Sequence, residues 1–240
     1  MNEHFAIDEP KEKEEKQKNP TQYYVKYSFV ITYILLLTTG TITFIEAMRT
    51  QLPSVRHIMN LETCISIVAG YFYSVFVQKI EEFSKNDKPI DWADITVTRY
   101  IDWSITTPMM LLVLSLVLGQ NINTAVKLPV IGSIFLLNYI MLFIGYLGET
   151  GTLEHQTAMI LGFIPFILMF GIIFNTFVKP KYVFANYSLY TVFVSIWTFY
   201  GIAYIFNEEY KNIAMNVLDC IAKCFVGIGL WAYFTKLIVL

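Results

Sequence analysis

Asp219 and Lys223 are the residues in this sequence most suited to chemistry, because both are ionisable and both lie inside a long apolar run, residues 213–240. Four residues make about one helical turn, so the carboxylate and the amine share one face of a helix. A buried ammonium must lose its proton or acquire a partner, and a lysine amine can also form an imine with an aldehyde. The pair alone is compatible with such a site and equally with an ion pair that ties this helix to its neighbours.

A second group of polar side chains lies in another apolar run, residues 96–119. At about 100° per residue, Arg99, Asp102, Trp103 and Thr106 fall on one stripe of a helix. Such a stripe is costly against lipid, so it must face the protein interior. Together the two runs bury two positive and two negative groups, the balance that a low-dielectric core requires. The tryptophan and the threonine favour a functional site over a purely structural ion-pair cluster.

The composition indicates which elements position these residues. Hydrophobic residues make up 55% of the chain and charged residues only 15%, well below the share of about 25% in soluble proteins. Long apolar runs in lipid predict helices, and short connections predict antiparallel neighbours. The expected fold is an all-α membrane protein, a seven-transmembrane-helix up-and-down bundle. The predicted segments are residues 25–48, 57–80, 96–119, 128–148, 155–178, 186–206 and 212–238.

The charges predict the domain boundaries and the orientation. Residues 1–24 are strongly charged and are expected to form an extracellular tail ahead of one helical domain, residues 25–240. The positive-inside rule assigns the basic loops to the cytoplasm, which leaves the amino terminus extracellular and the carboxyl terminus cytoplasmic. The basic loops carry Arg49, Arg56, Lys127, Lys179, Lys181 and Lys236; the opposite loops carry Glu81, Glu82, Asp87, Asp91, Asp94, Glu149, Glu154, Glu208 and Glu209.

The polar stripes also carry a family resemblance. One stripe resembles the third helix of the microbial rhodopsins, in Arg99-Tyr100-x-Asp102-Trp103-x-x-Thr106-Thr107-Pro108. The other resembles their retinal-binding seventh helix, in Leu218-Asp219-x-x-Ala222-Lys223. Both spacings are specific, and the resemblance covers all seven segments in order, about residues 25 to 238.

Further motifs narrow the resemblance. The sixth-helix pattern is similar in Trp197-x-x-Tyr200-Gly201, where glycine replaces the family's proline. A fourth-helix pattern close to that of the proteorhodopsins is Met141-x-x-x-Gly145-Tyr146-x-Gly148-Glu149. Resemblance to the rhodopsins of marine giant viruses comes from Asn60-Leu61-Glu62 and Ala69-Gly70-Tyr71-Phe72-Tyr73.

The resemblance implies a role for each matching residue. Lys223 would carry all-trans retinal as a protonated Schiff base in the core of the bundle. Asp102 would be the main counterion and proton acceptor, and Asp219 the second counterion. Arg99 would lie on the extracellular side, and Thr106 would hydrogen-bond Asp102. The remaining retinal-contacting residues would be Trp103, Trp197, Thr107, Met110, Met141, Gly145, Phe166 and Tyr200, with Tyr73 and Tyr200 orienting Asp219; Phe166 is equally compatible with an ordinary core position.

One departure from the family pattern concerns the cytoplasmic half. Proton pumps of this family usually place a carboxylic donor eleven residues after the acceptor, where this chain has Val113. Glu62, in the second segment, is predicted to lie toward the cytoplasm and could replace that donor. It is also compatible with a carboxylate reaching the headgroups, or with the constriction of a cation pore to which Asn138 and Asn216 contribute. Glu208 and Glu209 are interpreted as solvated loop acids.

The expected function is retinal-binding, light-driven ion transport, as an outward proton pump in which Asp102 accepts the proton from Lys223. The alternative is a light-gated cation channel, favoured by Val113 and Glu62, followed by a sensory photoreceptor. No enzymatic activity and no metal are expected. The expected partners are membrane lipid, protons or small cations, and further copies of the chain in a homo-oligomer. A net charge of −2 gives no electrostatic case for nucleic acid.

Overall fold

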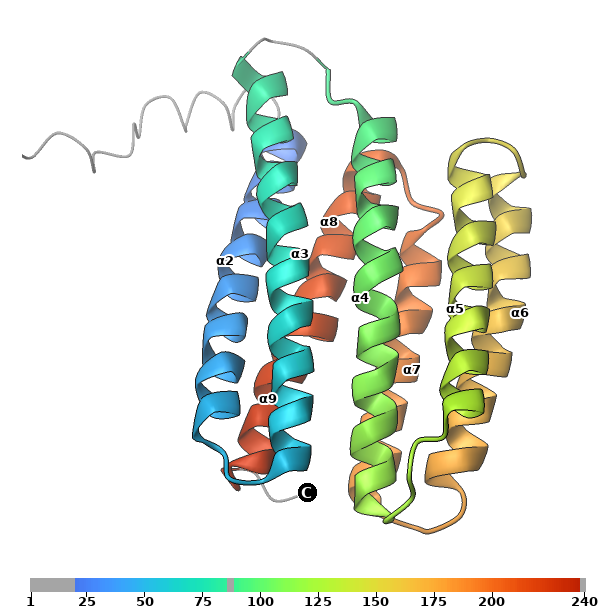
Figure 1. Cartoon of the computed structure of the whole chain (residues 1–240). Helices are drawn as coiled ribbons and strands as arrows, with labels where there is room; N and C mark the ends of the chain where they lie inside the picture. Colours follow the sequence, from blue (N-terminus) through green and yellow to red (C-terminus); the bar gives the residue numbers. More distant parts are fainter. Residues whose placement is uncertain (1–19, 86–88, 238–240) are drawn as a thin grey trace, which may run out of the picture.

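The described residues of this computed structural model, 20–85 and 89–237, form seven helical rods packed side by side (Figure 1). Each rod runs antiparallel to the one before it, as the short connections predicted, so the bundle prediction is confirmed. The rods are α2 (Pro20–Arg49), α3 (Pro53–Lys85), α4 (Trp92–Asn121), α5 (Leu128–Glu149), α6 (His155–Ile173) continued by the π-helical η1 (Phe174–Val178), α7 (Phe184–Ala203), and α8 (Glu208–Asp219) continued by the π-helical η2 (Cys220–Phe225) and α9 (Val226–Phe234).

Several helices extend beyond the predicted apolar segments. Helix α2 begins at Pro20, five residues ahead of the predicted start, and α3 runs from Pro53 to Lys85 where residues 57–80 were expected. Hydropathy marks the part of a helix that matches the hydrocarbon layer, whereas the helix itself continues into the headgroup region. The remainder of the predicted tail, residues 1–19, lies outside the described residues, as do Asp87 and residues 238–240.

Six of the described helical rods are long and apolar enough to cross a membrane. The exception is α7, which has 20 residues but includes Asn186 and three tyrosines. Tyrosine and tryptophan rank as weakly apolar on hydropathy scales although their rings pack well in a bundle. The seventh rod is therefore recognised by its place in the bundle rather than by hydropathy.

A proline in the third rod is compensated by its neighbour. Pro108 lies inside α4 and has no N–H, so the carbonyl of Ser104 one turn earlier loses its helical partner. The hydroxyl of Tyr139, on α5, donates to that carbonyl oxygen at 3.2 Å. Because an unpaired carbonyl is expensive in lipid, this contact explains how α4 tolerates the proline next to the polar stripe.

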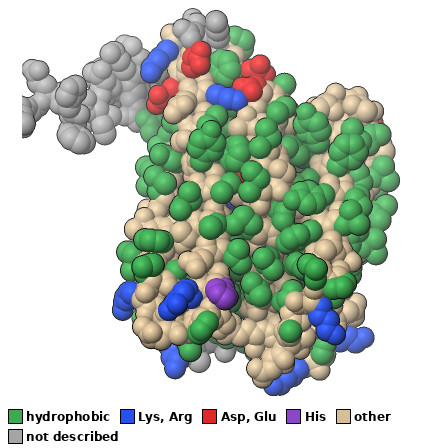
Figure 2. Space-filling model, viewed as in Figure 1, with side chains coloured by type: hydrophobic (Ala, Val, Ile, Leu, Met, Phe, Trp, Pro, Cys, Tyr) green, Lys and Arg blue, Asp and Glu red, His purple; other side chains and the backbone are tan. Residues whose placement is uncertain are grey.

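The two ends of the bundle differ in charge. In Figure 2, acidic and basic side chains gather together at the upper end, whereas the lower end shows lysine, arginine and histidine, and an apolar band separates the two. The upper end contains the α3–α4 connection, and the lower end contains the α2–α3 connection (Figure 1). These ends correspond to the acidic and basic loops of the sequence.

Asn186 joins three rods at the basic end. Its side-chain amide donates to the carbonyl oxygens of Leu118 and Phe177 at 2.9 and 3.0 Å, and its oxygen accepts from the amide of Asn121 at 2.8 Å. The two carbonyls lie near the carboxyl ends of α4 and η1, where main-chain acceptors lack intrahelical donors. Asn186 is completely buried and thus holds α7 against both helices.

Candidate functional site

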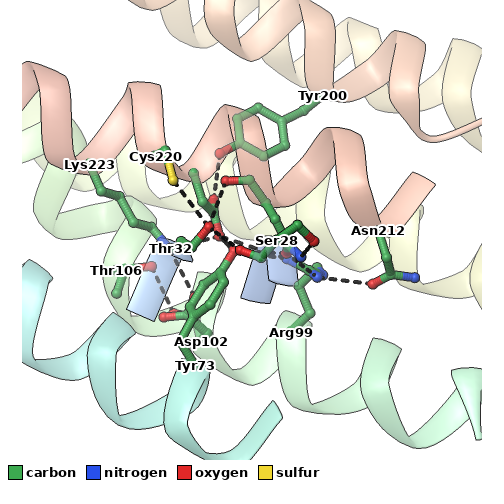
Figure 3. Close-up of polar contacts among 12 residues, drawn as sticks. Ser28, Thr32, Tyr73, Arg99, Asp102, Thr106, Tyr200, Asn212, Cys220 and Lys223 are labelled. Atoms are coloured by element: carbon green, nitrogen blue, oxygen red, sulfur yellow. Dashed lines mark hydrogen bonds and ion pairs between the residues drawn. The ribbon is translucent and has the colours of Figure 1, made fainter. Parts of the chain in front are cut away.

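Lys223 contacts two carboxylates in the bundle interior, and Figure 3 shows its side chain pointing toward Asp102. Its Nζ is 2.9 Å from Oδ2 of Asp102 on α4 and 3.4 Å from Oδ2 of Asp219, one turn earlier on its own rod. All three side chains are at most 1% exposed. Lys223 is part of the π-helical turn η2, and such turns frequently occur at functional sites. The structure therefore brings together the residues that the two apolar runs supplied.

Asp219 is held from both sides by tyrosines. The hydroxyl of Tyr73, on α3, donates to Oδ2 at 2.7 Å, and the hydroxyl of Tyr200, on α7, donates to Oδ1 at 2.5 Å. A carboxylate that accepts a hydrogen bond on each oxygen has little freedom to rotate. These are the contacts expected of the two residues; their role in orienting Asp219 remains a prediction.

Asp102 is less constrained. Its Oδ2 contacts Lys223, but its Oδ1 is buried without a hydrogen-bond partner among the described residues. Thr106 does hydrogen-bond Asp102, yet its hydroxyl donates to the main-chain carbonyl oxygen at 2.9 Å rather than to the carboxylate. Threonine one turn later in a helix commonly bonds in this way. The carboxylate thus keeps a free acceptor beside the amine.

The guanidinium of Arg99 lies on the side of the site nearer the acidic end. Its Nη2 donates to Oδ1 of Asn212 and to Oδ1 of Asn216, each at 2.9 Å, and its Nη1 is 3.7 Å from Oδ2 of Asp219. The rings of Phe29 and Phe76 also lie 5.4 and 5.1 Å from its central carbon. Asn216, which the pore alternative assigned to a cytoplasmic path, instead belongs to the arginine contacts.

A cavity opens beside Lys223 between α4, α5, α6, α7 and the last rod. Its space between atoms is about 830 Å³, including the part open to solvent. Eight predicted contact residues line it, namely Trp103, Thr107, Met110, Met141, Gly145, Phe166, Trp197 and Tyr200. The sequence did not indicate Tyr100, Leu142, Ala158, Met159, Gly162, Phe163, Gly201, Tyr204 and Met215, which complete the lining with Asp219 and Lys223.

Two glycines give this cavity its shape. A Cβ at Gly145 would lie 2.7 Å from the hydroxyl oxygen of Tyr100, and one at Gly201 would lie 2.6 Å from the ring of Phe163. Neither distance is compatible with ordinary van der Waals contact. The glycine that replaces the family's proline at position 201 therefore makes room for an aromatic ring in the cavity wall.

Glu62 is buried at 3% exposure on α3 and packs against the last rod. Gly227 lies one turn beyond Lys223, and a Cβ there would be 3.0 Å from Oε2 of Glu62. The glycine therefore leaves space for the Glu62 carboxylate. Val113, at the usual donor position, is fully buried in the apolar core. Glu62 thus faces the bundle interior rather than the headgroups, toward the basic end.

Lys211 forms a separate ion cluster near the acidic end. Its Nζ is 2.7 Å from Oε2 of Glu149 and 2.8 Å from Oε1 of Glu208, and its side chain is 3% exposed. Glu208 was expected to be a solvated loop acid; its side chain is 40% exposed, but it lies in the first turn of α8 instead of a loop and pairs with a lysine three residues later. The cluster joins the end of α5 to the start of the last rod.

A family model for bacteriorhodopsin-like proteins matches residues 24–237 of the chain. The chain belongs to this family. Among solved structures, the viral rhodopsin OLPVRII is 43% identical with a TM-score of 0.82, over 90% of this chain and 99% of that one. The blue light-absorbing proteorhodopsin from Med12 shares the fold, with a TM-score of 0.71 at 22% identity, over 89% of this chain and 98% of that one.

A curated relative, the green-light absorbing proteorhodopsin of Gamma-proteobacterium EBAC31A08, is 26% identical over 155 residues. The match spans 57% of this chain and 60% of the relative. The protein is thus a microbial rhodopsin and an integral membrane protein. It is similar to a viral rhodopsin, as the motifs indicated.

Membership in this family implies a retinal chromophore, and the cavity fits one. It is apolar and flanked by aromatic rings, and Lys223 supplies a buried amine at its wall. The buried Oδ1 of Asp102 and Nε1 of Trp197 have no partner among the described residues. An unpaired acceptor next to the amine is consistent with a site in which Lys223 Nζ carries retinal through an N–H-bearing bond beside Asp102.

Proposed function

We propose that this rhodopsin is a light-driven outward proton pump, with retinal bound to Lys223 and Asp102 as the proton acceptor. The observation that carries the proposal is the contact of 2.9 Å between Lys223 Nζ and Asp102 Oδ2, next to an Oδ1 that no described group occupies. Asp219, by contrast, already accepts hydrogen bonds from two tyrosines. Asp102 is therefore the carboxylate with capacity for a proton.

Bound retinal supplies the absorption of light and an isomerisation that changes the direction of the N–H bond at Lys223. The protein's residues do the rest. Asp102 and Asp219 stabilise the proton on Nζ in the resting protein, because a buried cation needs adjacent negative charge. When the contact with Asp102 weakens, the proton moves to the carboxylate 2.9 Å away, a distance suited to direct transfer.

A pump must return a proton to Nζ from the opposite side, and Glu62 is the proposed source. It lies on the basic half of the bundle, against Gly227 and one turn past Lys223. The residue at the usual donor position, Val113, cannot carry a proton. The route runs from the basic end through Glu62 and Lys223 to Asp102 and Arg99 near the acidic end. If the basic end is cytoplasmic, this route is outward.

A light-gated cation channel is the second candidate. Two buried hydroxyls near Glu62, those of Thr39 and Ser66, have no hydrogen-bond partner among the described residues, and unpartnered polar groups suit a path that admits water. Against a channel, buried apolar side chains pack toward the basic end around the buried amide of Asn186. These side chains include Met59, Val117, Leu118, Phe177 and Val178.

Photocurrent against voltage in cells supplied with retinal separates the two candidates. A pump produces an outward current that keeps its sign across the accessible voltages. A channel produces a current that reverses near the equilibrium potential of a cation. Asp102→Asn is the matched variant: it should abolish the pump current, while a channel in which Asp102 is only a counterion would still conduct.

A further inference from the structure

Arg99 is held mainly by uncharged groups. Both of its short hydrogen bonds, 2.9 Å each, go to the side-chain oxygens of Asn212 and Asn216, here called the asparagine pair. Its distance to the carboxylate of Asp219 is 3.7 Å, and no contact with Asp102 occurs in the described structure. A buried guanidinium ordinarily favours bidentate contact with a carboxylate. In this protein two carboxylates are near, yet amide oxygens make the closer contacts; Figure 3 shows the one with Asn212.

The orientation of both amides is fixed by other contacts. The hydroxyl of Ser28 donates to the carbonyl oxygen of Val25 at 2.7 Å, so toward Asn216 it can only accept, and Nδ2 of Asn216 donates to it at 2.8 Å. Nδ2 of Asn212 donates to the carbonyl oxygen of Glu208 at 2.9 Å. Since each Nδ2 has an acceptor of its own, each Oδ1 must point at the arginine.

We propose that the asparagine pair positions Arg99 through these oriented, uncharged oxygens and so keeps its guanidinium from closing on Asp219 and Asp102. Both asparagines are buried, at 2% and 0% exposure, so their oxygens face the guanidinium away from bulk solvent. The pair leaves Lys223 as the closer cation to both carboxylates. The consequence for proton transfer rests on the proposed role of Asp102, whereas the positioning itself does not.

Asn216→Leu tests the proposal, because it removes one oxygen while approximately keeping the volume. Arg99 then loses a partner in the interior and should close on the carboxylates. A nearer positive charge favours the ionised form of a carboxylate. In the retinal-bound protein we therefore expect the acid-induced colour change, which reports protonation beside Lys223, to move about one unit to lower pH. Asn216→Asp adds a charge that holds Arg99 more firmly and should move the same midpoint to higher pH.

The second measurement is a double-mutant cycle between Asn216 and Arg99. Thermal unfolding is followed by tryptophan fluorescence, so the result does not depend on colour or transport. Asn216→Leu should lower the melting temperature of the native chain by several degrees but cause less than half that loss in an Arg99→Met background. Asn186→Leu is the control, a buried asparagine at the opposite end. It should lower the melting temperature equally in both backgrounds and leave the pH midpoint unchanged.

Two results would overturn the proposal. One is an equal loss of melting temperature in both backgrounds, which would mean that Asn216 acts through its other partners, Ser28 and Tyr73, rather than through Arg99. The other is an unchanged or raised pH midpoint in Asn216→Leu, since Arg99 would then not be restrained from the carboxylates. If Asn216→Leu does not fold, Asn212→Leu is measured in the same way with the same expectations. A wild-type chain without photocurrent would refute proton pumping, but the double-mutant cycle would still test whether Asn216 positions Arg99.

Discussion

Replacing Glu62 by glutamine isolates the proposed donor step. The amide has nearly the shape of the carboxyl group, so its packing against Gly227 is retained while the transferable proton is lost. A positioned acid accelerates proton transfer by about 10²–10⁴-fold. Among the described residues, the usual donor position is occupied by the apolar Val113, and Thr39 and Ser66 offer only hydroxyls in place of an acid. We therefore expect reprotonation of Lys223 Nζ to slow at least about 100-fold, equivalent to about 2.7 kcal/mol.

Flash absorption spectroscopy measures this step as the return of the visible band after a laser pulse. In the Glu62→Gln variant the proton must come from bulk solvent, so the rate should fall about tenfold per unit increase in pH, whereas the wild-type rate should vary little near neutral pH. Added azide, a small weak acid, should restore the rate. Glu46→Gln, which removes a carboxylate at the same end on α2, is the control and should behave as wild type. A Glu62→Gln return as fast as wild type would refute the donor assignment.

Three further variants test the remaining site. Lys223→Ala should bind no retinal covalently, and a coloured protein would reassign the attachment site. Asp102→Asn should abolish the loss of the Nζ proton after a flash, and an unchanged flash response would transfer the acceptor role elsewhere. Lys211→Met leaves the buried carboxylate of Glu149 unpaired, which costs about 3–5 kcal/mol, so the melting temperature should fall by several degrees. The control variant Glu209→Gln should leave the melting temperature unchanged. An equal fall in the two variants would show that the cluster has no structural role.

The bundle and much of the cavity could be predicted because both follow local rules. Apolar length marks the membrane rods, and motif spacing places Asp102, Asp219 and Lys223 on inward faces. Eight contact residues were carried over from the family resemblance, six of them within the motifs, and all line the cavity. Their functional roles remain predictions, since contact with a cavity does not establish a step in transport.

What could not be predicted is which partner each buried polar group finds. Arg99 contacts residues 113 and 117 positions away, and Lys211 contacts one 62 positions away. A polar residue in an apolar run indicates that a partner exists but does not identify it. A usable signal was present, because Asn212, Asn216, Asp219 and Lys223 recur at spacings of four, three and four, one polar face of the last rod. The hydrogen bond from Tyr139 that compensates for Pro108 has no comparable signature.

The π-helical turn Cys220–Phe225 has a consequence for how this protein can change. A π turn contains one residue more than an α turn and so offsets the phase between the rod's two halves by about 100°. One half presents Asn216 and Asp219 to the interior, and the other presents Gly227 to Glu62. Straightening this turn into an α turn at the same chain length would rotate one half away from its partners, whereas deleting one residue within it would leave an α turn with both halves still in phase. At its present length, an idealised α-helix could therefore not replace the last rod.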